Sequence, residues 1–223
     1  MSDLHKDHIN WMLENVEVKN FHRDTVFFFD DLVSLITALS SFDIAIEVHE
    51  RCGNAPNSMK RDHSINLYGR FVTYSWNPYF TLACLSNDEW PNTLTLAKLP
   101  PYSPATKSRV ELKETGISSF INSTCGLTFM LYFERIKPII KAKYSEPSNW
   151  PELFNFCRIV RNSIAHGGKI YFQSSNSAPL KWNDIKICHI DNNEVIFQPQ
   201  KYIGVGDLIL LIEECDHLLT KTL

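Results

Sequence analysis

The spacing of apolar residues between Thr25 and Arg51 is the feature that most constrains the fold of this chain. Apolar side chains recur there at every third or fourth position, as they do on the buried face of an α-helix: Val26, Phe29, Val33, Ile36 and Leu39. Asp24 is a favourable N-cap, and Gly53 comes just after the segment. The pattern predicts one long helix over residues 25–51 that packs through a single face.

Three later segments have the same helical periodicity, and they cover residues 126–144, 150–166 and 207–221. Pro138 lies inside the first of them, at a position where a helix could bend or end. The second has Asn149 as its predicted cap and Gly167-Gly168 as its stop. An apolar stripe runs along the third: Leu208, Ile212, Cys215 and Leu219. These helices are therefore expected to supply most of the core.

The segments between the predicted helices do not show the helical spacing of apolar residues. Residues 53–126 lack a clear period and hold six of the 11 prolines, so we expect an irregular insertion there. Around Asp191-Asn192-Asn193, two stretches rich in Ile, Val and Phe predict a β-hairpin over about 181–199. The expected fold is mainly α: one domain over residues 1–223, built as a helical bundle with an irregular insertion and a small hairpin before the last helix.

Charge and composition exclude several classes of protein. The net charge of -3 excludes a strongly basic nucleic-acid coat, so any contact with nucleic acid must be local. No run of 18 apolar residues occurs, and the N-terminus lacks a secretion signal, so we expect a cytoplasmic protein. The cysteines form no CxxC pair, which argues against a disulfide framework or a zinc site and favours buried free thiols: Cys52, Cys84, Cys125, Cys157, Cys188 and Cys215.

The helix predicted over residues 150–166 has two unlike faces. Its core stripe holds Leu153, Cys157, Val160 and Ile164. Arg158, Asn162 and His166 follow one another along the opposite face at spacings of four. A solvated surface is the ordinary interpretation of such a face. Because Phe154 and Ile159 flank it, however, we expect another helix or a second subunit to cover it and to bury the polar groups in part.

The run Arg161-Asn162-Ser163-Ile164-Ala165-His166-Gly167 resembles the signature of the HEPN superfamily. In that signature an Arg is followed by a polar residue such as Asn, and a His comes after four to six intervening residues. The local match covers about residues 150–168, and the other predicted helices fit the helical bundle of the family loosely. The insertion and the hairpin lie outside the pattern of the family.

The resemblance implies a metal-independent endoribonuclease that needs no cofactor. Such proteins act as dimers with one composite cleft, and they are common in bacterial toxin-antitoxin and antiviral systems. His166 would be the general acid or base, Arg161 would bind the scissile phosphate, and Asn162 would orient the imidazole or hold a phosphate oxygen. Arg158 and Lys169 are the predicted substrate-binding residues. An antitoxin protein would be a further partner besides RNA and a second copy of the chain.

Two features of the sequence bear on this hypothesis. Arg161 and His166 lie about 140° apart on a helix, which makes it awkward for both side chains of one subunit to reach the same phosphate. A two-fold dimer would instead bring the Arg161 of one subunit near the His166 of the other. Residues 130–186 carry nine basic against four acidic residues, and several lysines could line an RNA path: Lys137, Lys141, Lys143 and Lys169. The alternatives are a HEPN-like scaffold without catalysis and an unrelated helical interaction protein in which the motif is a coincidence.

Overall fold

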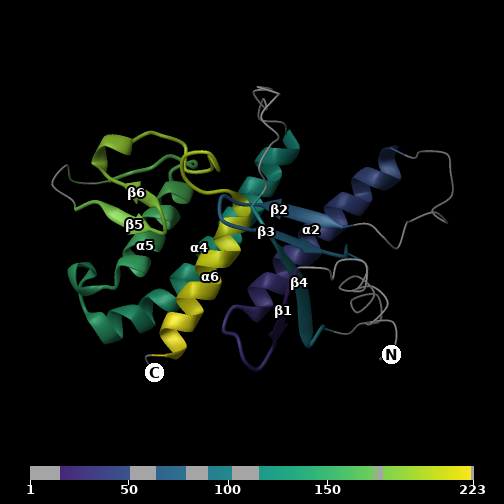
Figure 1. Cartoon of the computed structure of the whole chain (residues 1–223), viewed down its shortest axis with the longest axis horizontal. Helices are drawn as coiled ribbons and strands as arrows, with labels where there is room; N and C mark the ends of the chain where they lie inside the picture. Colours follow the sequence, from purple (N-terminus) through teal and green to yellow (C-terminus); the bar gives the residue numbers. More distant parts are fainter. Residues whose placement is uncertain are drawn as a thin grey trace. The chain divides into compact units, whose positions relative to one another are not determined.

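The computed structural model describes residues 16–50, 64–78, 90–101, 116–172, 174 and 178–221. The chain divides into two compact units, residues 1–102 and 103–223, and each is described by itself. Figure 1 shows strands β1 to β4 with helix α2 in the first unit, and helices α4 to α6 with strands β5 and β6 in the second. Whether the two units together form the predicted single domain is not tested by the structure of each unit, so the single domain stays a prediction.

The first unit contains a four-stranded antiparallel sheet in the order β1-β4-β3-β2. The strands are β1 (Glu17–His22), β2 (Ile65–Tyr68), β3 (Thr73–Trp76) and β4 (Thr93–Leu99). The register pairs Phe21 with Leu94 and Leu67 with Tyr74, so large apolar side chains share one face of the sheet. These side chains are buried, and they form the sheet side of the core of this unit.

Helix α2 (Phe29–Glu50) packs on that apolar face. The indole Nε1 of Trp76 in β3 donates a hydrogen bond to Ser40 Oγ of α2 at 3.1 Å, which ties the helix to the sheet. The predicted apolar stripe is confirmed, because Val33, Ile36 and Leu39 are buried. The predicted N-terminus is wrong: turns occupy residues 23–25, and the first helical turn holds Asp30 and Asp31, where acidic side chains favour the positive end of the helix.

The sheet corrects the predicted fold class. The chain is a mixed α/β protein and not a mainly helical bundle. Strands β2, β3 and β4 lie within residues 53–126, which the sequence predicts to be irregular. Strand β1 lies where the sequence predicts neither a helix nor a strand. The strands are short, with four residues in β2 and β3, so they leave little periodic signal. Gly53, the predicted helix stop, lies outside the described residues.

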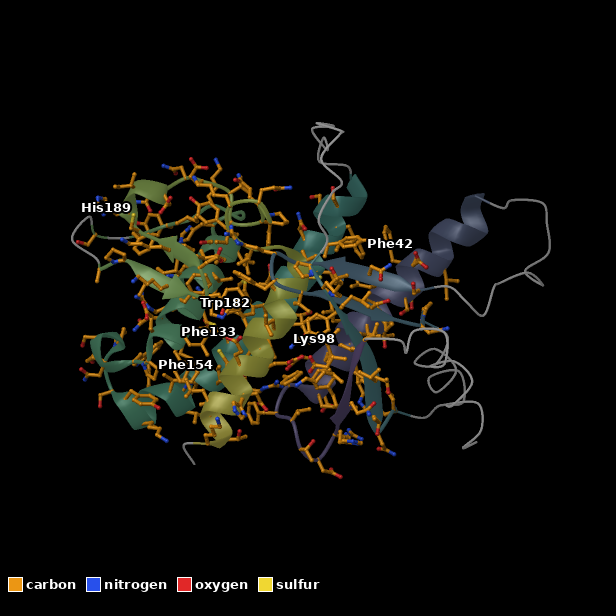
Figure 2. All side chains as sticks on the ribbon, in the orientation of Figure 1. Phe42, Lys98, Phe133, Phe154, Trp182 and His189 are labelled. Atoms are coloured by element: carbon orange, nitrogen blue, oxygen red, sulfur yellow. The ribbon has the colours of Figure 1, made fainter. Side chains whose placement is uncertain are left out.

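The second unit is built around three helices: α4 (Gly116–Tyr144), α5 (Glu152–Ala165) and α6 (Val205–Thr220). Helix α4 packs against both α5 and α6, and the hydroxyl of Tyr132 donates to the Ile212 carbonyl oxygen at 3.3 Å. Figure 2 labels Phe133 and Phe154, two fully buried side chains of α4 and α5. The predicted stripe of α6 is buried as expected: Leu208, Ile212, Cys215 and Leu219.

Two helix boundaries in this unit differ from those expected. Helix α4 begins ten residues before Gly126, and Pro138 lies inside it without ending it. Gly126 is a point of close approach: a Cβ there would lie 3.0 Å from Ile164 Cγ2 of α5. Asn149 does not cap α5. It ends the short 3-10 helix η1 (Pro147–Asn149), and Pro151 occupies the N-cap position of α5.

The β-hairpin of this unit lies at one end of the predicted stretch. Its strands are β5 (Leu180–Trp182) and β6 (Ile185–Ile187). The turn uses Asn183, whose positive φ of 51° is tolerated by Asn better than by most residues. Asp191, expected in the hairpin turn, instead belongs to the 3-10 helix η2 (His189–Asp191), where its carboxylate accepts hydrogen bonds from Cys188 N and the Tyr202 hydroxyl.

Four of the cysteines lie among the described residues. Cys125, Cys157 and Cys215 are free and buried and Cys188 is half-buried, whereas Cys52 and Cys84 lie outside the described residues. Burial raises the pKa of Cys125 to about 12, so this thiol stays protonated and unreactive at neutral pH. Among the described helices, none is long and apolar enough to cross a membrane.

Candidate functional site

The candidate site lies on helix α5, whose buried face is wider than predicted. Phe154, Phe156 and Ile159 are at most 2% exposed, together with Cys157 and Val160. Leu153 and Ile164, expected at the centre of the core stripe, are only half-buried. Residues of the same chain therefore cover Phe154 and Ile159, and these two side chains need no second subunit to remove them from water.

The C-terminal end of α5 is a glycine-dependent stop, as the sequence predicted. His166 is the C-cap residue, and Gly167 and Gly168 follow with φ values of 72° and 80°. The Gly168 amide donates to the Ser163 carbonyl oxygen at 2.8 Å, which closes the last turn. Left-handed backbone at two consecutive positions favours glycine. The turn leaves His166 exposed at the end of the helix.

Arg161 is held by a carboxylate from the neighbouring helix. Its Nε lies 2.6 Å from Oε1 of Glu134 in α4, and both atoms are buried. A guanidinium Nη1 donates to Asn162 Oδ1 at 3.4 Å, a long hydrogen bond. The Arg161 side chain as a whole remains 28% exposed. The guanidinium is thus fixed at one edge by an ion pair while part of the side chain reaches solvent.

His166 has a different neighbour. Its imidazole ring lies 4.9 Å from the ring of Tyr171, centroid to centroid, with a 43° angle between the ring planes. Within residues 116–172, no hydrogen bond or ion pair joins the imidazole to the side chain of Arg161 or Asn162. The structure thus brings Arg161 and Asn162 together and leaves His166 beside an aromatic ring. The partial burial expected for Asn162 is present, whereas His166 is exposed.

Among residues 116–172, neither predicted substrate-binding residue has a side-chain hydrogen bond to Arg161 or Asn162. Arg158 Nε donates to Asn155 Oδ1 at 3.3 Å. Asn155 in turn donates to the carbonyl oxygens of Pro147 and Trp150, which braces the start of α5. Burial lowers the pKa of the Arg158 guanidinium below its usual range. Lys169 is exposed just after the double glycine, and its backbone forms a bridge with Val195.

Glu134 and Tyr171 were not among the predicted site residues. Glu134 is an ordinary charged residue in the sequence of α4, and only the packing of α4 on α5 brings it to Arg161. Tyr171 comes three residues after the double glycine, a turn signal that could have indicated that the chain returns toward His166. Both residues lie in direct contact with a residue of the motif.

The site offers cationic and imidazole groups for acid-base chemistry on an anion. In the described part of the chain, no three His, Cys, Asp or Glu side chains form a group that could hold a metal ion. A scan against protein-family models, a search of curated proteins and a search of solved structures each returned no match.

Proposed function

We propose that this chain is a metal-independent endoribonuclease whose chemistry depends on Arg161 and His166. The observation that carries the proposal is the end of α5, where a guanidinium fixed by Glu134 and an exposed imidazole lie within one and a half helical turns. RNA supplies its own nucleophile, the 2′-hydroxyl. The protein has only to move protons and to stabilise the charge that develops on the phosphate.

The roles follow from the surroundings of each group. The exposed imidazole of His166 can meet a substrate directly, and an imidazole ring can both donate and accept a proton. A guanidinium carries five N–H donors, and the Nε of Arg161 already faces Glu134. The edge formed by Nη1 and Nη2 is suited to paired hydrogen bonds with phosphate oxygens. Asn162, in contact with Nη1, would help to orient that edge.

A two-fold dimer would complete the site. In one subunit Arg161 faces Glu134 of α4 and His166 faces Tyr171, so the two groups have different neighbours. A dimer would bring the Arg161 of one subunit near the His166 of the other. As part of the same proposal, the enzyme acts in the cytoplasm as a toxin or as an antiviral or stress-defence effector, and an antitoxin protein restrains it.

A cleavage assay tests the proposal. Purified protein is incubated with mixed cellular RNA and EDTA, alongside Arg161→Ala and His166→Ala, with folding and dimer content matched. His217→Ala, which removes an exposed histidine from α6, is the control. We expect the parent and His217→Ala to cut RNA, and the two site variants to lose roughly 100-fold or more of the rate. Intact RNA with every protein, when dimers are present, would contradict the proposal.

The second candidate function is a HEPN-like dimerisation or RNA-binding scaffold without catalysis. The ion pair itself favours this alternative, because Glu134 offsets the positive charge that a phosphate would need from Arg161. The same assay separates the candidates when RNA binding is measured beside cleavage. A scaffold would bind RNA or dimerise without cutting RNA, and His166→Ala would leave its binding unchanged.

A further inference from the structure

The segment that follows His166 exposes side chains on alternate sides. Lys169 is exposed, Ile170 is 1% exposed, Tyr171 is 46% exposed and Phe172 is 6% exposed. In extended backbone, side chains at i and i+2 lie on the same side of the chain. Ile170 and Phe172 therefore anchor the segment in the core, while Lys169 and Tyr171 both project to solvent next to the end of α5.

Backbone hydrogen bonds hold this segment in place on both sides of Tyr171. The Ile170 amide donates to the Glu194 carbonyl oxygen at 2.8 Å, and the Asn193 amide donates to the Ile170 carbonyl oxygen at 3.0 Å. The side-chain amide of Asn192 forms two hydrogen bonds with the backbone of Phe172, as a neighbouring strand would. Its Oδ1 accepts from the Phe172 amide at 2.7 Å, and its Nδ2 donates to the Phe172 carbonyl oxygen at 3.3 Å. Tyr171 is thus an exposed ring on a fixed backbone.

An exposed ring on a fixed backbone is well suited to stacking. Tyrosine has few rotatable bonds, so little side-chain entropy is lost when a ligand covers its ring. One part of the Tyr171 ring contacts the imidazole of His166, and nearly half of the side chain remains open to solvent. A planar group that stacks on the open part would lie beside the imidazole. The Lys169 ammonium, on the same side of the segment, would attract an anion joined to that planar group.

We propose that Lys169 and Tyr171 form a binding strip for single-stranded RNA, in which an unpaired base stacks on Tyr171 and a flanking phosphate contacts Lys169. Aromatic rings combined with cations are the common means of binding single strands. Bases inside a duplex already stack on their neighbours, so they cannot use the ring. The inference rests on the proposed function, and it assigns to Tyr171 and Lys169 the contacts that hold an unpaired nucleotide beside His166.

Binding to an RNA that cannot be cut tests this inference separately from catalysis. The probe is a fluorescent RNA of mixed sequence with 2′-O-methyl riboses, which lack the attacking hydroxyl, used as a single strand and as a duplex. Fluorescence anisotropy gives Kd for the parent, Tyr171→Ala, Tyr171→Leu and Tyr171→Phe. Tyr68→Ala is the matched control, because Tyr68 is also 46% exposed but lies in the first unit. Circular dichroism checks the fold of each variant.

We expect Tyr171→Ala and Tyr171→Leu to bind the single strand roughly tenfold or more weakly, and Tyr171→Phe and Tyr68→Ala to bind like the parent. Lys169→Ala should make the slope of log affinity against log salt less negative by about 0.7. The parent should prefer the single strand to the duplex. Equal single-strand affinity of the parent and Tyr171→Leu, or a parent that prefers the duplex, would overturn the inference.

The two proposals fail separately. If the parent binds the single strand through Tyr171 but cuts no unmodified RNA in the presence of EDTA, the binding strip is supported and the proposed nuclease activity is contradicted. If the parent cuts RNA while Tyr171→Leu retains the parental Kd and the parental cleavage rate, the nuclease is supported and the binding strip is contradicted.

Discussion

At the residue scale, Glu134 forms an ion pair with Arg161 and would fix the direction of its guanidinium in the proposed site. We expect Glu134→Gln to lower kcat for RNA cleavage roughly tenfold, because the guanidinium loses the charged partner at Nε that fixes its direction. KM should change little if the phosphate binds the other edge of the guanidinium. The free energy of unfolding should fall by about 1 kcal/mol, since the Nε atom is buried and is left without a charged partner.

Lys137→Ala is the control for that change. Lys137 also pairs with Glu134, at 3.3 Å, but more of its side chain is exposed, so its removal should lower the free energy of unfolding by less than about 0.5 kcal/mol. Lys137 is also one of the lysines expected along the RNA path, so a lost phosphate contact should appear as a higher KM, with kcat unchanged. Steady-state kinetics and urea unfolding give both quantities. An increase in kcat for Glu134→Gln would mean that the carboxylate competes with the phosphate, and it would contradict a positioning role.

The carboxylate of Asp191 predicts a pH dependence of stability. Burial alone would raise its pKa, yet hydrogen bonds from Tyr202 and Cys188 and the charge of Lys201 hold it below the usual range. A depressed pKa in the folded state adds stability above the unfolded value near 4, and this stability is lost as the pH falls through the folded pKa. Asp191→Asn should therefore lower Tm at pH 7.

The difference in Tm between the parent and Asp191→Asn should shrink as the pH is lowered below about 4. Thermal unfolding of both proteins between pH 7 and pH 2.5 measures it. Tyr202→Phe removes one of the donors and should give a smaller loss of Tm with the same pH trend. A gap that stays constant across this range would show that packing, and not the charge of Asp191, accounts for the loss.

At the scale of elements, the contact between α4 and α5 depends on Gly126. A Cβ there would lie 3.0 Å from Cγ2 of Ile164, an atom fixed by the stiff χ1 of a β-branched side chain in a helix. Alanine favours a helix over glycine by about 1 kcal/mol, but overpacking costs about 1 to 3 kcal/mol. We expect Gly126→Ala to destabilise the protein by about 1 kcal/mol.

A double-mutant cycle tests the cause. In an Ile164→Ala background the clash is absent, so Gly126→Ala should become stabilising by up to about 1 kcal/mol through helix propensity alone. Urea unfolding of the four proteins gives the coupling. If Gly126→Ala has the same effect in both backgrounds, the close approach of the two helices at this position is not what requires glycine.

The elements also show how far the sequence could predict the structure. Helices with long apolar repeats were found, because each repeat reports a buried face: residues 33, 36 and 39 of α2 are buried, as are Cys157 and Val160 of α5. Strand β4, Thr93–Leu99, has apolar residues at alternate positions, which would have supported a strand. The surrounding prolines obscured that signal, and β2 and β3 are too short to give one.

The sequence predicts the residues of the motif but not the residues that contact them. Arg161, Asn162 and His166 lie within six positions of one another, so the sequence alone could group them. Glu134 is 27 positions from Arg161, and its pairing depends on which face of α4 meets α5. The direction of a side chain is a second limit of the sequence. A helical projection places Arg158 and Asn162 on the same face, but Arg158 Nε donates to Asn155 Oδ1, one turn toward the N-terminus.

At the scale of the whole molecule, the proposed dimer makes a prediction that a single subunit cannot satisfy. If the Arg161 of one subunit acts with the His166 of the other, Arg161→Ala and His166→Ala are each inactive, yet a mixed dimer of the two contains one complete site. The second site of the mixed dimer lacks both groups. Random exchange makes half of the dimers mixed, so an equal mixture should recover about one quarter of the parental activity.

The experiment mixes the two inactive variants, allows their subunits to exchange, and follows cleavage of a labelled single-stranded RNA in EDTA. Exchange is confirmed by size-tagged subunits, and a mixture of Arg161→Ala with the double variant Arg161→Ala/His166→Ala is the matched control, because no dimer in it contains Arg161. Recovery in the first mixture alone would mean that the two groups act across the interface. Exchange without recovery, beside an active parent, would mean that each subunit uses its own Arg161 and His166.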